Sequence, residues 1–374
     1  MYRNRMTARD AYLYVLRSAL WGEPLSESIP AGQLKEVLSI AKAQSTLPLV
    51  CQALLLSPGQ ELSDSQKVSM QNKLRSTVSL HLRSNHVIAL LTAGLRARGI
   101  DPVLMKGQGV ASYYKTPYLR ECGDIDLYVG KSRYTEACKT VAAMAGIEDV
   151  PEWSERKKHY NVNVEGVPVE LHWTSDLLPK RYDAAYQEYS LDGMTHGLVQ
   201  KAIDGEVVNT PADSFNAFFI FNHTWHHFVT GGVGLRQFCD WVMLLHAKAG
   251  GLDLDHIKEI LERLDLMDPW QVFGKVAVEH LGLPSEEMPF YNEKSDPRVE
   301  QVLDIVFREG NFGHERQELR NRPKNFFVAK TRSLMIHVWR YSKMMSMFGR
   351  VATCQFTEML TGGIRTAAEE FGEK

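Results

Sequence analysis

Two aspartates in the first half of the chain have the spacing of metal ligands on a strand. Asp124 and Asp126 alternate with apolar residues in the stretch DIDLYV, and this period of two predicts a strand with both carboxylates on one face. Neighbouring carboxylates repel each other unless a cation lies between them, and Mg²⁺ prefers such oxygen ligands. Two acids on an exposed edge strand can also serve only to prevent aggregation, so the interpretation depends on the surrounding residues.

A third acid lies on a later predicted strand. In VPVELHW (167–173) the apolar residues alternate with Glu170 and His172, which therefore share the opposite face. If the two strands are neighbours, three carboxylates converge, as two metal ions roughly 3.5–4 Å apart would require. We predict that Asp124, Asp126 and Glu170 bind two Mg²⁺ ions and form the catalytic centre.

A lysine-glycine pair precedes the aspartates. Lys106-Gly107 ends the apolar run 102–105 and begins a predicted helix. The free N–H groups of a helix start bind anions, and a glycine lets a phosphate approach the backbone closely. Lys106 and Arg120 can add charge-assisted hydrogen bonds to a triphosphate. When each residue is considered alone, an ordinary surface position explains Lys106 equally well, and an ordinary turn explains Gly107 equally well.

These residues lie in a short mixed segment between two helical ones. Apolar residues recur at helical spacing in residues 1–98 and again in 211–374, whereas 99–210 reads as strand, helix, strand, helix and hairpin. We expect Ser132 to cap the helix 132–146 and Gly166 to form the turn of the hairpin. The predicted fold is α+β, with a small mixed-sheet core (99–210) between helical regions 1–98 and 211–374.

Composition excludes several classes of protein. The 374 residues carry a net charge of −2, so no global positive field attracts nucleic acid. The five cysteines form no C-x-x-C pair, which argues against a structural zinc site or a disulfide framework. The N-terminus lacks the apolar segment of a signal peptide, and the longest apolar run (87–95) is too short for a transmembrane segment. We predict a cytoplasmic location.

Three motifs together resemble a known superfamily. LMKGQGVASYY, RECGDIDLYVG and VELHW occur in this order between residues 104 and 173. They are similar to the nucleotidyltransferase superfamily, the polymerase-beta-like fold, and in particular to its branch of uncharacterised bacterial nucleotidyltransferase-like proteins. The likeness extends over about residues 85–245, because a histidine-bearing helix followed by a Leu-Arg…Asp helix is also typical of that branch.

The resemblance implies an activity. Such proteins move a nucleoside monophosphate from an NTP to an acceptor hydroxyl and release pyrophosphate, and Glu170 would take the proton of the acceptor. The resemblance also implies an NTP-binding set, which is Lys106, Gly107, Gln108, Arg120 and Gly123. The acceptor stays open among a sugar, another small molecule, a protein and RNA. Gln108 stands where most of the superfamily has Gly or Ser, and this departure favours the alternative of an inactive protein that binds a nucleotide or a partner.

The helical segment after 211 adds candidates for the wall of the cleft. His223 and His227 are four residues apart on one predicted helix face. A zinc-protease helix would need a Glu where Thr224 stands, so we expect these histidines to face substrate or to lie in the core. Arg236 and Asp240 have the same spacing, which predicts an intrahelical ion pair or a place in the cleft. The predicted cleft-lining residues are His172, His223, His227, Arg236 and Asp240.

Two further interpretations follow from local patterns. Gly107–Ser112 nearly fits a dinucleotide-binding fingerprint, but Ser112 replaces its third glycine and no further βαβ units follow. Residues 308–350 contain ten Lys and Arg against three Asp and Glu, with aromatic residues between them. That segment predicts either a solvated helix face or weak contact with an anionic surface.

Overall fold

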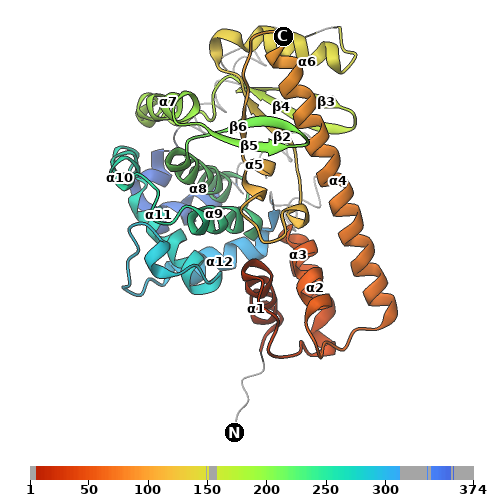
Figure 1. Cartoon of the computed structure of the whole chain (residues 1–374). Helices are drawn as coiled ribbons and strands as arrows, with labels where there is room; N and C mark the ends of the chain where they lie inside the picture. Colours follow the sequence, from red (N-terminus) through yellow and green to blue (C-terminus); the bar gives the residue numbers. More distant parts are fainter. Residues whose placement is uncertain are drawn as a thin grey trace.

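The computed structural model describes residues 6–148, 150, 158–311, 335, 338–354 and 357. Over these residues the protein has a mostly helical α+β fold, in which a six-stranded mixed sheet is flanked by helices (Figure 1). The predicted fold class is confirmed. None of the helices in this part of the chain is both long enough and apolar enough to span a bilayer.

The chain begins with helices, as predicted. They are α1 (Ala8–Trp21), α2 (Ala31–Ala43), α3 (Leu47–Leu56) and α4 (Asp64–Arg96). Thr7 and Ser63 begin α1 and α4 with capping boxes, in which each hydroxyl accepts a hydrogen bond from a free N–H of the first turn. The last turns of α4 pack against the sheet, which places the long helix along one side of the molecule (Figure 1).

The sheet brings the two carboxylate-bearing strands together. Its strands are β1 (Val103–Met105), β2 (Ile125–Tyr128), β3 (His159–Val164), β4 (Val167–His172), β5 (Val199–Ile203) and β6 (Glu206–Thr210). Their order is β3-β4-β2-β1-β6-β5, with β2 antiparallel to β1 and parallel to β4. The predicted hairpin at Gly166 is present, and its turn residues Glu165 and Gly166 both have positive φ, as a tight hairpin turn requires.

The structure adds elements that the sequence interpretation missed. These are the helix α7 (Lys180–Thr195) and the hairpin β5-β6, and the hairpin completes the sheet on the far side of β1. Asp204 and Gly205 form the turn of that hairpin, with φ values of 48° and 85°. An Asp-Gly pair between alternating residues is a strong hairpin signal, so this element was predictable.

Helices cover one face of the sheet. Ile125 and Leu127 join the last turns of α4 and the helix α6 (Tyr134–Met144) in a hydrophobic cluster on that face. The predicted cap at Ser132 is wrong, because 131–133 form a 3-10 turn and α6 begins at Tyr134 without a side-chain cap. With its apolar residues in this cluster, β2 directs Asp126 to the opposite face, towards the C-terminal helices.

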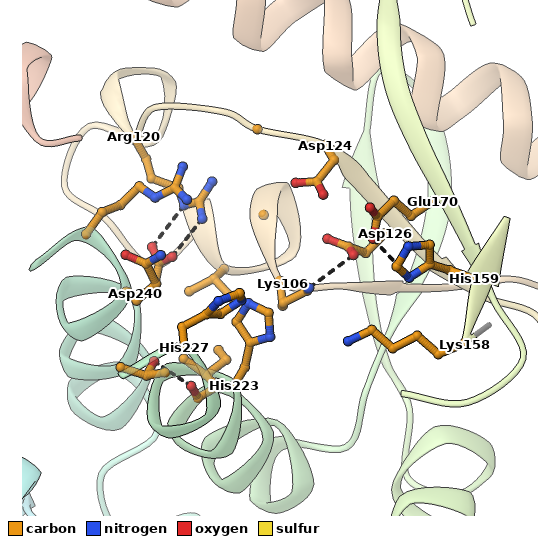
Figure 2. A pocket seen from close by; sticks show the side chains of 17 residues that line it. Lys106, Arg120, Asp124, Asp126, Lys158, His159, Glu170, His223, His227 and Asp240 are labelled. Carbon is orange, nitrogen blue, oxygen red and sulfur yellow. Dashed lines mark hydrogen bonds and ion pairs between the residues drawn. The ribbon is translucent and has the colours of Figure 1, made fainter. Parts of the chain in front are cut away.

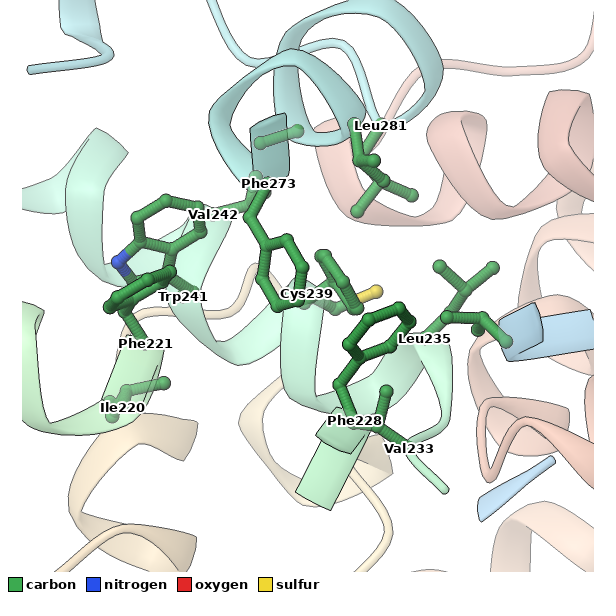
Figure 3. Close-up of a cluster of buried hydrophobic side chains, with 14 of the residues drawn as sticks. Ile220, Phe221, Phe228, Val233, Leu235, Cys239, Trp241, Val242, Phe273 and Leu281 are labelled. Carbon is green, nitrogen blue, oxygen red and sulfur yellow. The ribbon is translucent and has the colours of Figure 1, made fainter. Parts of the chain in front are cut away.

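The helices on both sides of the sheet segment share one core. The C-terminal helices are α8 (Asp213–Thr230), α9 (Leu235–Ala247), α10 (Leu254–Arg263), α11 (Met267–Lys275) and α12 (Arg298–Glu309). Their buried aromatic residues, including Phe228, Trp241 and Phe273 (Figure 3), belong to the same cluster as Tyr12 of α1 and Val37 of α2. Segments more than 200 residues apart in sequence therefore fold as one hydrophobic unit.

The described part of the basic segment has a buried face and an exposed face. Residues 338–354 are helical, and Tyr341 and Phe348 pack in the shared core. Arg340 is 3% exposed and donates hydrogen bonds to Glu309 and to the carbonyls of Phe228 and Val229. Arg340, Tyr341 and Phe348 therefore face inward, whereas Trp339 and Arg350 are exposed, and the predicted anionic-surface contact stays a prediction. Phe326, Phe327 and the rest of 312–334 lie outside the described residues.

Candidate active site

The pairing of β2 with β4 brings the predicted acids together. Asp126 lies beside Glu170 in the parallel register, and Asp124 immediately precedes β2. Ligand oxygens of Asp124, Asp126 and Glu170 lie within 4.8 Å of one another. Because Asp126 and Glu170 are direct neighbours on one face, the alternation in each strand suffices to place both carboxylates at one point.

Asp124 and Asp126 differ in the direction in which their pKa values are shifted. Burial alone would raise the pKa of Asp126, but Lys106 and a hydrogen bond from His172 outweigh it and hold that pKa below its ordinary value. The pKa of Asp124 is raised, first by loss of hydration and then by the charge of Asp126. The cluster therefore carries more negative charge than its protein neighbours balance.

Lys106 reaches Asp126 from a strained backbone. Its φ of 51° and ψ of −150° lie in a region that residues with a Cβ rarely adopt, and Gly107 also has a positive φ of 47°. The ammonium Nζ lies 3.0 Å from Oδ1 of Asp126. The helix that follows, α5 (Gly107–Ala111), is only five residues long, so its dipole adds little to anion binding.

His172 lies behind the carboxylates and not in the cleft, which corrects its predicted place. It is 1% exposed, and its Nε2 lies 3.0 Å from Oδ1 of Asp126 and 3.3 Å from Oε2 of Glu170. Ionised carboxylates only accept hydrogen bonds, so Nε2 is the protonated nitrogen. His172 therefore holds the two acids in position.

Arg120 and Asp240 form a buried pair between the loop before β2 and α9. Arg120 donates from Nε and Nη2 to the two carboxylate oxygens of Asp240, at 2.9 and 2.6 Å. The hydroxyl of Tyr114 donates to the same carboxylate at 2.6 Å. The predicted ion pair between Arg236 and Asp240 is therefore wrong, because Asp240 is fully engaged by Arg120. Arg120 positions the pocket wall and has little capacity left for a phosphate.

Arg236 lies on the same wall of the pocket, and its positive charge has fewer partners than that of Arg120. Its Nη1 donates to the carbonyl of Glu121 at 3.1 Å, and its buried Nε has no hydrogen-bond partner. Burial and the nearby Arg120 lower the pKa of Arg236, which nevertheless stays charged, as arginine does in proteins. No ion pair of Arg236 occurs among the residues that the structure describes.

His223 and His227 face the same space from α8. Burial and the charge of Lys106 lower the pKa of both imidazoles, that of His227 to about 3. Both rings are therefore neutral at physiological pH. Within the described ranges, the groups of three metal-capable side chains lie on the sheet and include neither histidine, so a zinc site on α8 has no support.

These side chains line one pocket of about 240 Å³ (Figure 2). The predicted residues that line it are Lys106, Gly107, Arg120, Gly123, Asp124, Asp126, Glu170, His223, His227, Arg236 and Asp240. Gln108 is buried beneath the pocket and does not line it. In Figure 2 the carboxylates lie on one side of the space and the Arg120–Asp240 pair on the other.

The sequence interpretation missed Lys158 and His159. Lys158 lines the pocket, and its Nζ lies 3.1 Å from Oδ1 of the buried Asp176. His159 lies opposite His172 in the antiparallel register of β3 and β4, with 4.9 Å between the ring centroids. His159 is in phase with Asn161, which pairs with Glu170, so strand alternation alone could have found it.

Comparison with known proteins identifies the family of the chain. The model of a family described as uncharacterised nucleotidyltransferases matches residues 30–282, which is more than half of the chain. The chain therefore belongs to that family. The matched range includes helices on both sides of the sheet segment, in keeping with their shared core.

A solved structure is also similar to the chain. It is the crystal structure of an antigenic nucleotidyltransferase-like protein from Paracoccidioides brasiliensis, with 14% sequence identity, coverage of 56% of this chain and 96% of that chain, and a TM-score of 0.31. At these values the likeness adds nothing to the family assignment. No curated protein sequence matches the chain.

Proposed function

We propose that the pocket transfers a nucleoside monophosphate from an NTP to an acceptor hydroxyl, with Mg²⁺ bound to Asp124, Asp126 and Glu170. The observation that supports this most strongly is the convergence of these three acids in a pocket that is also lined by cations and neutral imidazoles. Carboxylates without phosphate-binding cations would suit a simple cation site. Both together suit a nucleotide bound with its metal.

The acids fit the metal that the family implies. Two charges 4.8 Å apart repel by roughly 3 kcal/mol at an effective dielectric near 20, and by less where water reaches them. The raised pKa of Asp124 reflects this crowding as well as its lost hydration. Bound divalent ions would relieve the repulsion and neutralise charge on the phosphates.

The cations are placed to hold the phosphates. Lys106 follows β1, Lys158 precedes β3 and Arg236 lies on α9, and all three line the pocket. Gly107 has no Cβ, so a phosphate can approach its backbone N–H. Positioning and charge neutralisation account for most of phosphoryl-transfer catalysis, and these residues can supply both.

Glu170 is placed to accept the proton of the acceptor. Burial would raise its pKa, but the hydrogen bond from His172 lowers it below its ordinary value, so Glu170 is ionised at neutral pH. The acceptor oxygen bonds to the α-phosphorus, the bond from that phosphorus to the bridging oxygen breaks, and pyrophosphate leaves. The hydroxyl proton passes to the carboxylate of Glu170.

A second function is nucleotide binding without turnover. Gln108 supports it, because a buried glutamine side chain stands in the phosphate turn where most of the superfamily has Gly or Ser. NTP binding without any product would favour this function over catalysis.

The test is incubation with each α-labelled NTP, Mg²⁺ and an extract of the host cell as the source of acceptor. We expect labelled product and pyrophosphate from the wild type, and neither from Asp126→Asn. Asp204→Asn, in the β5-β6 turn, is the matched control and is expected to behave as the wild type. Because Asp126 is buried, Asp124→Asn at the pocket mouth serves as a second variant that does not threaten folding. Equal activity of all these proteins would remove the aspartates from the reaction.

The proposed substrate also implies a location. The five cysteines are free, which agrees with a reducing compartment. NTP is abundant in the cytoplasm, where we propose that the protein acts.

A further inference from the structure

A second, open concavity adjoins the carboxylates over β3 and β4, towards the edge of the sheet. It has a volume of about 390 Å³ and is lined by Asp124 and Glu170 together with residues of β3 and β4. Asn161, Asn163 and Pro168 are its exposed members on that hairpin. We call these three residues, with Asp124 and Glu170, the hairpin shelf. The proposed reaction centre therefore lies between two cavities that share Asp124 and Glu170.

The register explains why the shelf faces the reaction centre. Asn161 pairs with Glu170, and Glu170 pairs with Asp126, so these side chains form one row across three strands. Asn163 pairs with Pro168 in the next row. Directly paired residues point to the same face of a sheet, so both amides lie on the face that carries the metal-binding acids.

The two cavities differ in charge. The pocket is lined by Lys106, Lys158 and Arg236, as a triphosphate requires, whereas none of the described residues lining the shelf is Lys, Arg or His. Apart from the metal ions that the acids would bind, an anionic acceptor would meet no cationic side chain there. The amides of Asn161 and Asn163 each donate and accept hydrogen bonds, which matches the donor and acceptor capacity of hydroxyl groups.

The position of β3 argues against an extended peptide as the acceptor. β3 is an edge strand of the sheet, so a peptide that paired with it would form a further strand. That strand would lie roughly 10 Å from β4, at two strand spacings. Serine and threonine hydroxyls end one bond beyond Cβ and would not reach Glu170 from there.

We propose that the hairpin shelf binds the acceptor, and that the acceptor is a neutral polyhydroxyl compound of the carbohydrate class. This inference rests on the proposed nucleotidyl transfer. One hydroxyl lies at Glu170, gives its proton to that carboxylate and bonds to the α-phosphorus as pyrophosphate leaves. The remaining hydroxyls bind the amides of Asn161 and Asn163.

The first test identifies the labelled product that the wild type forms from an α-labelled NTP, Mg²⁺ and host-cell extract. We expect mass spectrometry to show a nucleoside monophosphate joined to a neutral sugar or polyol. A product that ribonuclease or protease degrades, or one that contains a sugar phosphate, would overturn the acceptor assignment and leave the proposed transfer standing. If the wild type forms no product at all, the proposed transfer itself fails.

The second test asks whether the shelf binds that acceptor. Asn161→Ala and Asn163→Ala should each raise the KM for the acceptor by roughly fivefold, as expected for the loss of one hydrogen bond. The KM for NTP should not change. Gln200→Ala removes an exposed amide from β5 at the opposite edge of the sheet and is the matched control. An unchanged acceptor KM in both Asn variants, or an equal rise in the KM for NTP, would overturn the assignment.

Discussion

The two walls of the pocket differ in how their charged side chains are balanced by neighbouring charges. On the sheet wall, Asp124, Asp126 and Glu170 outnumber Lys106, the cation that pairs with them. On the helical wall, Asp240 binds Arg120 through both carboxylate oxygens, and Arg236 is a second cation that has no ion pair among the described residues. A matched buried pair gives the wall a defined geometry. The excess of acid on the sheet wall needs a further cation, and it is there that we place the chemistry.

The largest effect is expected from breaking the matched pair. Asp240→Ala leaves the buried Arg120 without its partner and should lower the free energy of unfolding by about 3–5 kcal/mol. Urea denaturation measures this. Glu188→Ala, which breaks the exposed pair with Arg263, should change it by less than about 1 kcal/mol. The double variant Arg120→Met/Asp240→Leu should recover part of the loss, and a single-variant loss below about 1 kcal/mol would contradict the comparison.

Removing the charge of Glu170 from the sheet wall should chiefly lower the rate of the reaction. Glu170→Gln keeps the shape but loses a metal ligand and the proton acceptor, so the rate of product formation should fall on the order of 100- to 1,000-fold. Glu165→Gln, in the exposed turn next to the same strand, is the control and should retain the wild-type rate. A Glu170→Gln protein with more than about half the wild-type rate would exclude Glu170 from the mechanism.

Substitution of Arg236 tests whether the helical wall also binds phosphate. Arg236→Met keeps the aliphatic stem and removes the guanidinium, so the KM for NTP should rise roughly tenfold or more, in line with a charge-assisted hydrogen bond. Steady-state kinetics at saturating acceptor measure this. Arg83→Met, on the exposed side of α4, should leave the KM unchanged. A normal KM for Arg236→Met would confine phosphate binding to the sheet wall.

The smallest expected effect is a change in the Tm of the metal-free protein. A raised pKa means that the folded state disfavours the charged form of Asp124, so Asp124→Asn should raise the Tm in EDTA by about 1–2 °C. Mg²⁺ should raise the Tm of the wild type, because a ligand that binds the folded state stabilises it, and should raise that of Asp124→Asn much less. Differential scanning calorimetry with and without Mg²⁺ compares them, and equal shifts for both proteins would place the metal elsewhere.

The sheet wall was largely predictable, and the helical wall was not. Alternation in DIDLYV and VPVELHW placed Asp126 and Glu170 on the polar faces of their strands, and the β2–β4 pairing confirmed that they meet. The partner of Asp240 was mispredicted, because Arg236 has the right spacing along α9 whereas Arg120 approaches from another element. His172 was predicted in the cleft, since its strand phase is correct, but the depth of a side chain depends on what covers it.

Local order along the chain sufficed for the strands β1 to β4 and for the faces that carry the acids, because these follow from a period of two residues. Three features needed the tertiary structure: the neighbour of each strand, the pairing of Arg120 with Asp240, and the core that α1 and α2 share with helices more than 200 residues away. Such contacts join residues that no period relates. They form only when the chain closes a long loop and buries enough apolar surface to offset the entropy of closure.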